Sequence, residues 1–157
     1  MIRSRTLEEA AERQRFIQAD GPRIEPYSPD EMPDMALDMH GRVSVVANRN
    51  DHIHSKEDLP EFFGTLMRHP ALFEKQTEFG LELLARGAIP PRERELAILR
   101  IAWHCGAPYE FGEHVFFAHR LGITSEEIDA VKTGPDAGNW SAHERLVITA
   151  ADELFEN

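Results

Sequence analysis

Apolar residues recur at helical spacing along most of the chain, and no stretch alternates apolar and polar residues as a half-buried strand would. The most continuous apolar surface runs from Pro91 to Gly122, where the pattern predicts two helices joined at Gly106. The apolar positions of the first helix cover more than one side, which indicates burial between neighbours: Leu96, Leu99, Ile101, Ala102 and Trp103. In the second helix they are Phe117, Ala118 and Leu121. The pattern predicts an all-α fold organised around this helical hairpin.

Capping signals and prolines mark the ends of the other predicted helices. Capping-box spacing at Thr6–Glu9, Thr124–Glu127 and Ser141–Glu144 predicts helices over 7–17, from 124 to about 131, and from 141 onward. Two further helices, from Leu59 and over 71–86, meet at His69-Pro70, because the residue before proline disfavours helical backbone. Their apolar residues predict core positions, among them Phe63, Leu72, Phe73, Phe79 and Leu83.

The region before these helices has a different character. Residues 21–34 contain four prolines and predict an extended connector. The methionines of 32–39 predict a flexible apolar segment that wraps another subunit. We therefore divide the chain into an N-terminal helix and proline-rich extension, 1–57, and a helical domain, 58–157.

Composition excludes several classes of partner. The net charge of −11 over 157 residues disfavours nucleic acid and anionic membrane surfaces, because both recruit lysine and arginine. No apolar run is long enough to span a membrane. The first residues lack the apolar core of a signal peptide and are too rich in glutamate for a transit peptide, which predicts a cytoplasmic protein. A single cysteine rules out an internal disulfide and a Cys-x-x-Cys pair.

Candidate chemistry is concentrated in the second helix of the hairpin. Glu110 and His114 are four residues apart and therefore share one face, next to a phenylalanine-rich stripe. This arrangement is typical of a partly buried polar site, and also of an ordinary boundary between core and water. The spacing of Glu110, His114 and His119 does not match a metal-binding pattern, so no metal is predicted.

Several separated motifs agree in order and spacing with a known family. They are the Pro-Arg-x-Arg-Glu-Leu-x-Ile-Leu-Arg helix, Tyr-Glu-x-x-x-His, and Ala-x-x-x-Gly-Ile followed by Ser-Glu-Glu-Ile. Over residues 63–154 the chain resembles the carboxymuconolactone decarboxylase / alkyl hydroperoxidase D-like family. The resemblance implies an all-α fold built around a helical hairpin and a homo-oligomer, whether dimer, trimer or hexamer. Relatives with this pattern continue for one or two helices beyond the position of Phe155, which implies that the domain is shortened here.

The family has two chemistries, and this chain resembles one of them. In the peroxidase branch a Cys-x-x-Cys pair precedes the histidine, but here Ala107 and Glu110 occupy those positions. A dithiol peroxidase needs one thiolate to attack the peroxide and a second thiol to resolve the sulfenic acid. Cys105 lies two residues too early, at a helix C-terminus that disfavours a thiolate, and is expected to be buried and inert.

The decarboxylase branch acts on a small carboxylated lactone without metal or organic cofactor. The residues here suit such acid–base work, and our hypothesis is a relay in which His114 transfers the proton, Glu110 orients it and Glu95 completes the relay across the hairpin. Tyr109 is expected to donate to a developing enolate oxygen. Arg94 or Arg100 is expected to hold a substrate carboxylate.

Three functions stay open from the sequence. The first is a decarboxylase-like lyase that acts on a small carboxylated or aromatic-derived compound, with no cofactor. The second is an alkylhydroperoxidase or peroxiredoxin-type activity that uses Cys105 with an outside thiol. The third is an oligomeric small-molecule binder without turnover, in which Glu95 pairs with Arg92 or Arg94, and Glu110 with His114, only to stabilise helices.

Overall fold

The computed structural model describes residues 5–46 and 53–156. Within these residues the chain is built of helices and contains no strand, which confirms the all-α prediction. It forms two compact units, Met1–Asp20 with Ile89–Asn157, and Gly21–Ala88. The division predicted at residues 57 and 58 falls inside the second of these units. Among the described residues, no helix combines the length and apolar character needed to cross a lipid bilayer.

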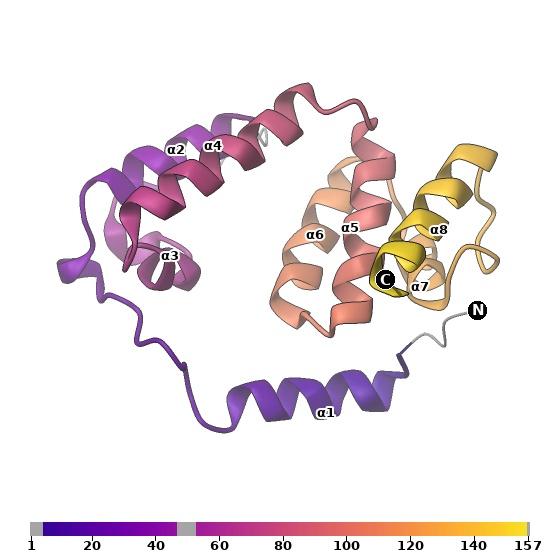
Figure 1. Cartoon of the computed structure of the whole chain (residues 1–157), viewed down its shortest axis with the longest axis horizontal. Coiled ribbons are helices and arrows are strands. Elements are labelled where there is room, and N and C mark those ends of the chain that lie inside the picture. Colours follow the sequence, from indigo (N-terminus) through magenta and orange to yellow (C-terminus); the bar gives the residue numbers. More distant parts are fainter. Residues whose placement is uncertain (1–4, 47–52, 157) are drawn as a thin grey trace. The chain divides into compact units, whose positions relative to one another are not determined.

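The first unit is organised around the predicted hairpin. Helix α5 (Pro91–Cys105) and helix α6 (Pro108–Arg120) lie side by side, and α7 (Ser125–Thr133) and α8 (Ala142–Glu156) also pack on α5 (Figure 1). Gly106 ends α5 with φ 59°, a left-handed conformation that glycine adopts without strain. The core of this unit is Leu96, Leu99, Ala118, Ile123, Ile128, Val131, Trp140 and Ile148.

The capping boxes predicted for α7 and α8 also tie these helices to α5. At the start of α7 the backbone N–H groups of Thr124 and Glu127 each donate to the other residue's side-chain oxygen, and Ser141 and Glu144 do the same at the start of α8. The guanidinium of Arg92 on α5 then binds both capping glutamates, with Nε 2.7 Å from Oε1 of Glu144. These two contacts show that the partner of Arg92 is not Glu95.

Helix α1 (Leu7–Gln18) belongs to the same unit and begins at the predicted capping box of Thr6 and Glu9. The chain just before it is attached to the end of α5. The indole Nε1 of Trp103 donates to the Arg5 carbonyl at 3.1 Å, and Arg5 Nη2 donates to the His104 carbonyl at 3.1 Å. None of the residues of α1 is buried.

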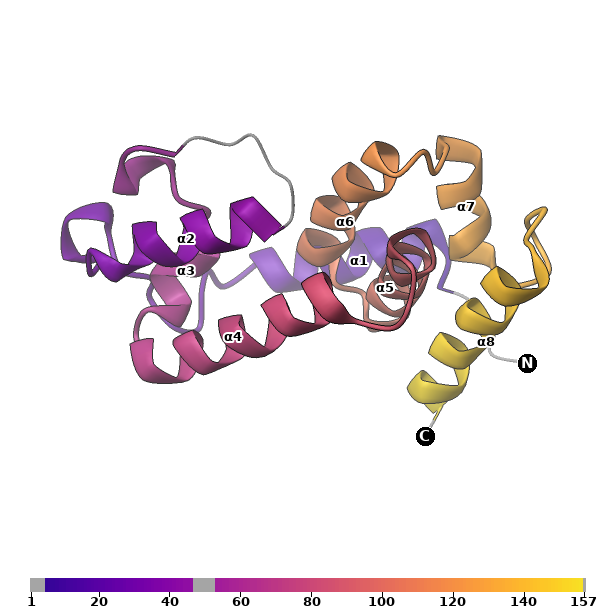
Figure 2. The same cartoon turned by 90° about the horizontal axis from the view of Figure 1, so that it is seen from above.

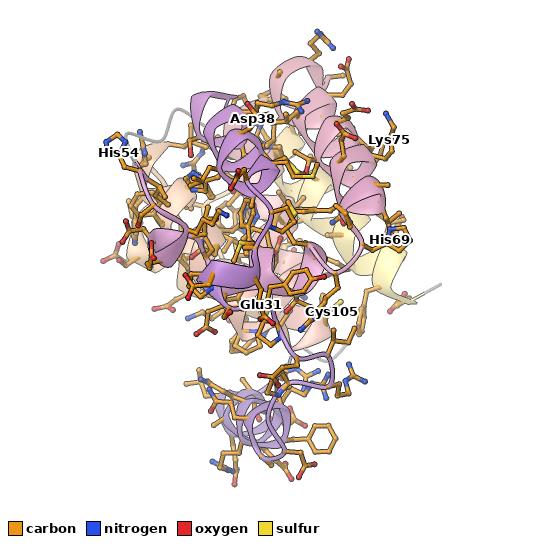
Figure 3. The ribbon with its side chains drawn as sticks, turned by 90° about the vertical axis from the view of Figure 1, so that its left-hand side faces the viewer. Glu31, Asp38, His54, His69, Lys75 and Cys105 are labelled. Atoms are coloured by element: carbon orange, nitrogen blue, oxygen red, sulfur yellow. The ribbon has the colours of Figure 1, made fainter. Side chains whose placement is uncertain are left out.

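The second unit contains α2 (Met35–Val46), α3 (Glu61–Leu66) and α4 (Pro70–Arg86), with short 3-10 turns at Pro29–Glu31 and Lys56–Asp58. Helices α2 and α4 run side by side (Figure 2). Their core is Met32, Ala36, Met39, Leu59, Phe63, Met67 and Phe73. The exposed residues of this unit include charged side chains such as Asp38 on α2 and Lys75 on α4 (Figure 3).

Two predictions about this unit were wrong. The methionine segment was expected to be flexible, but Met35–Val46 is a helix and Met39 is only 1% exposed. In the sequence, Pro33 and Gly41 weakened the signal for this helix, whose apolar side packs within the unit. Helix α4 was expected to be core throughout, yet Leu72 and Phe79 are 61% and 66% exposed, because α2 covers only the side that carries Phe73 and Thr77.

Candidate active site

The central feature of the hairpin is a hydrogen bond between its two helices. Glu95 lies in the second turn of α5 with its side chain 1% exposed, and His114 lies in the middle of α6. Oε2 of Glu95 is 2.6 Å from Nδ1 of His114. A buried carboxylate is tolerated only when a partner offsets the loss of hydration, and the imidazole supplies that partner.

The other nitrogen of the same imidazole faces a second carboxylate. Nε2 of His114 is 3.2 Å from Oε1 of Glu110, one turn earlier on α6. The two carboxylates differ in environment, because the Glu110 side chain is 56% exposed and that of Glu95 is 1% exposed. His114 therefore connects a buried carboxylate to one in contact with water.

The two carboxylates determine the charge of His114. Burial by itself would lower its pKa, but the hydrogen bonds to Glu110 and Glu95 and their negative charges outweigh burial and raise the pKa from 6.5 to about 9. The hydrogen bond with His114 in turn lowers the pKa of Glu110. At neutral pH the site therefore holds an imidazolium that carries a proton on each nitrogen, between two carboxylates.

Arg94 binds the oxygen of Glu95 that His114 leaves open. Its Nε and Nη2 atoms each lie 3.0 Å from Oε1 of Glu95. Arg94 was predicted to hold a substrate carboxylate, and the structure places it on a carboxylate of the chain itself. Both ion pairs that the sequence offered as helix stabilisers, Glu95 with Arg94 and Glu110 with His114, are present, and His114 joins them into one network.

Arg100 lies in a separate network in the same unit. Its side chain is 1% exposed, its Nε is 2.5 Å from Oδ1 of Asp152 on α8, and its Nη1 donates to the carbonyls of Val131 and Lys132. His104 also binds Asp152, with Nε2 2.7 Å from Oδ1. The structure thus places Arg100 between α5, α7 and α8.

Asp152 and His104 were not among the predicted site residues. Burial raises the pKa of Asp152, but the hydrogen bonds from Arg100 and His104 and their charges lower it overall. Asp152 is 52 residues from Arg100 and 48 from His104. No short motif connects residues at that separation, so spacing carried no signal for this network.

Two further predicted residues lie on either side of the hairpin turn. Tyr109 is in the first turn of α6 and is 52% exposed, and its role as a hydrogen-bond donor to substrate stays a prediction. Cys105 was expected to be buried, but it is exposed at the last residue of α5 (Figure 3). The helix ends there, so the side chain is not covered by a following turn.

Two of the hollows in the first unit lie beside the hairpin turn and beside α8. One, of about 300 Å³, lies between α1 and the hairpin turn, with Trp103 and Phe111 in its wall. The other, of about 640 Å³, lies beside α8 and includes Arg100 and Asp152. Within the part of the chain that the structure describes, no three His, Cys, Asp or Glu side chains gather in a way that could hold a metal ion.

Comparison with known proteins agrees with the motif resemblance. Residues 70–153, more than half of the chain, match the model of the Carboxymuconolactone decarboxylase family. The chain belongs to this family. The matched residues include the whole of α5 and α6, and with them Glu95, Glu110 and His114. No curated protein and no solved structure matches the chain.

Proposed function

We propose that the Glu95–His114–Glu110 site is an acid–base centre that decarboxylates a small carboxylated lactone or a related aromatic-derived compound. The observation that carries the proposal is the single imidazole held between two carboxylates, one buried and one exposed. Membership in the carboxymuconolactone decarboxylase family supports the choice of reaction. The specific substrate is part of the proposal.

The protonation state of the site suits the donation of a proton to carbon. The pKa of His114 is raised to about 9, so its imidazolium form dominates at neutral pH. Nδ1 is engaged with buried Glu95, whereas Nε2 faces the exposed Glu110 side chain. We assign the transferred proton to Nε2, because Glu110 can rotate toward solvent and leave this N–H to a substrate.

The proposed reaction balances with one proton. The bond between the substrate carbon and its carboxylate breaks, carbon dioxide leaves, and the electron pair moves into the ring as an enolate with migration of the double bond. The ring carbon at the end of that system takes the Nε2 proton from His114. Neutral His114 then regains a proton from water through Glu110. The net change is loss of carbon dioxide and gain of one proton, which the chain's own groups are able to transfer.

We propose roles for Glu95 and Glu110 that differ from those expected from the sequence. Glu110 was predicted to orient His114 and Glu95 to complete the relay. We now assign orientation to Glu95, because it is buried and makes the shorter contact, at 2.6 Å. Glu110, more than half exposed, takes the exchange of protons with solvent.

The test is turnover of a panel of five-membered lactones that carry a carboxylate on the ring, followed by carbon dioxide release. In deuterated water the product should contain one deuterium at the protonated carbon. His114→Gln should lower kcat/KM by roughly 10²- to 10⁴-fold, the usual contribution of a general acid. His143→Gln is the matched control, because His143 is an exposed histidine in the same unit.

Two results would contradict the proposal. One is that no member of the panel loses carbon dioxide although the lactones bind, which would favour the non-catalytic binder. The other is turnover that His114→Gln leaves intact.

A further inference from the structure

We propose that Arg94 is a positioning residue of this site, which holds the Glu95 carboxylate so that Oε2 faces Nδ1 of His114. This inference rests on the proposed function for its catalytic consequence, but its structural part can be tested without a substrate. It replaces the role in substrate binding that the sequence suggested for Arg94.

The geometry divides the Glu95 carboxylate between two donors. Nε and Nη2 of Arg94 both lie 3.0 Å from Oε1, and Nδ1 of His114 lies 2.6 Å from Oε2. Each oxygen therefore has its own cationic partner. Neighbouring residues on a helix point about 100° apart and seldom face each other, so the arginine side chain has to fold back to make this contact.

Two donors on one oxygen restrict the rotation of the carboxylate about its last bond. Because Nε and Nη2 of one rigid guanidinium converge on Oε1, they restrict the position of that oxygen more than the single ammonium of a lysine would. With Oε1 held by Arg94, Oε2 is left pointing across the hairpin. Because Oε2 binds Nδ1 of His114, holding Oε1 in place also restricts the orientation of the His114 ring.

Arg94 also balances the charge of Glu95 during the proposed reaction. Glu95 is 1% exposed, so its negative charge requires a positive partner at every stage. When His114 gives up its proton it becomes neutral and no longer offsets that charge. The Arg94 guanidinium, 22% exposed, remains charged beside Glu95 at that moment. Arg94 thus lets His114 lose a proton without leaving an unpaired buried carboxylate.

The test begins with nuclear magnetic resonance of the full chain labelled with ¹⁵N at histidine. The short charged bond from Nδ1 of His114 to Glu95 should give a downfield proton signal that exchanges slowly with water. Glu95→Gln identifies the signal by removing it. In Arg94→Gln we expect the signal to be lost to exchange, with circular dichroism unchanged. Arg94→Lys, which keeps the charge and removes the fork, should retain the signal with faster exchange.

Arg145→Gln is the matched control, because Arg145 lies on α8 of the same unit and pairs with Asp136 at the surface. It should leave the His114 signal as in the wild type. If Arg94→Gln does not fold, the exchange rate in Arg94→Lys decides the matter. A signal in Arg94→Lys that exchanges as slowly as in the wild type, or one that survives in folded Arg94→Gln, overturns the proposal.

Kinetics separates the positioning role from a substrate clamp. A positioning residue should lower kcat when removed, by roughly 10- to 100-fold, with little change in KM, and Arg94→Lys should restore part of the loss. A substrate clamp should instead raise KM, which would overturn the proposal. If wild-type protein turns over no lactone, the proposed function fails, whereas the magnetic resonance result still decides the role of Arg94.

Discussion

Nδ1 of His114 lies 2.6 Å from Oε2 of Glu95, nineteen residues earlier in the chain and on the facing helix of the hairpin. This contact links the two helices through a charged group that is almost fully buried. Together with the hydrogen bond to Glu110, it raises the pKa of His114, which burial alone would lower.

Replacing Glu95 by glutamine should lower the pKa of His114 from about 9 toward its ordinary value of 6.5. The substitution removes a negative charge and a charged acceptor from Nδ1, while the desolvation of His114 remains. Titration of the His114 resonances measures the change. Glu93→Gln, which changes a carboxylate on α5 that faces His143 instead, is the control. An unchanged titration of His114 in Glu95→Gln would refute the assignment of its raised pKa to this contact.

The stability of the protein should depend on pH through His114. Its folded pKa of about 9 exceeds the 6.5 of an unfolded chain, so its contribution is complete below about pH 6.5 and is lost as pH rises through about 9. The loss should reach up to about 3 kcal/mol, the free-energy equivalent of that difference. Urea unfolding of the wild type and of His114→Gln, between pH 6 and 10, measures it. Parallel curves for the two proteins would show that His114 is not the group responsible.

Asp152→Asn should destabilise the protein strongly. Asp152 is the carboxylate partner of Arg100, whose side chain is 1% exposed, and also accepts from His104. Removing one member of a buried ion pair costs about 3–5 kcal/mol, because the other charge stays buried without a counter-ion. Since Arg100 keeps two carbonyl acceptors, we expect the lower end of that range. Arg145→Gln breaks an exposed pair and should cost less than about 1 kcal/mol in the same unfolding assay.

Cys105→Ser should leave lactone decarboxylation unchanged. Cys105 ends α5 and is exposed, but the proposed proton transfer uses none of its atoms. The same variant tests the peroxidase alternative. Rapid consumption of an organic hydroperoxide by the wild type with an added thiol, abolished in Cys105→Ser, would revive that alternative. Decarboxylation that falls with the loss of the thiol would contradict the proposed mechanism.

The exposed apolar residues of α4 should contribute to assembly of a homo-oligomer. Leu72, Phe79 and Leu83 are each at least 51% exposed, and their spacing places them along one side of the helix. We expect the wild type to be oligomeric by light scattering, and a variant with glutamate at all three positions to have a lower mass. Gln76→Glu, at an exposed polar position of the same helix, is the control. A monomeric wild type, or an unchanged mass in the triple variant, would contradict this prediction.

Much of the fold follows from patterns that are local in the sequence. The three capping boxes, the break at His69-Pro70 and the turn at Gly106 are all present as predicted. Each depends on residues within about four positions of one another, and at that separation the local backbone geometry alone determines which residues are in contact. Helix α2 was missed because Pro33 and Gly41 weaken the local signal, and packing of Met39 in the core compensates for them.

For the candidate site, the sequence by itself determined the pairing of Glu110 with His114, because residues four apart on a helix meet whatever the rest of the chain does. Family resemblance added Glu95, but only the tertiary structure decided that it binds His114 directly and that Arg94 supports it. The same is true of the hydrogen bond that Arg100 donates to Asp152. The reason is physical. A buried charge here pairs with a residue on another helix, and which residues come within reach depends on how the helices pack. The spacing of residues along the chain does not give that information.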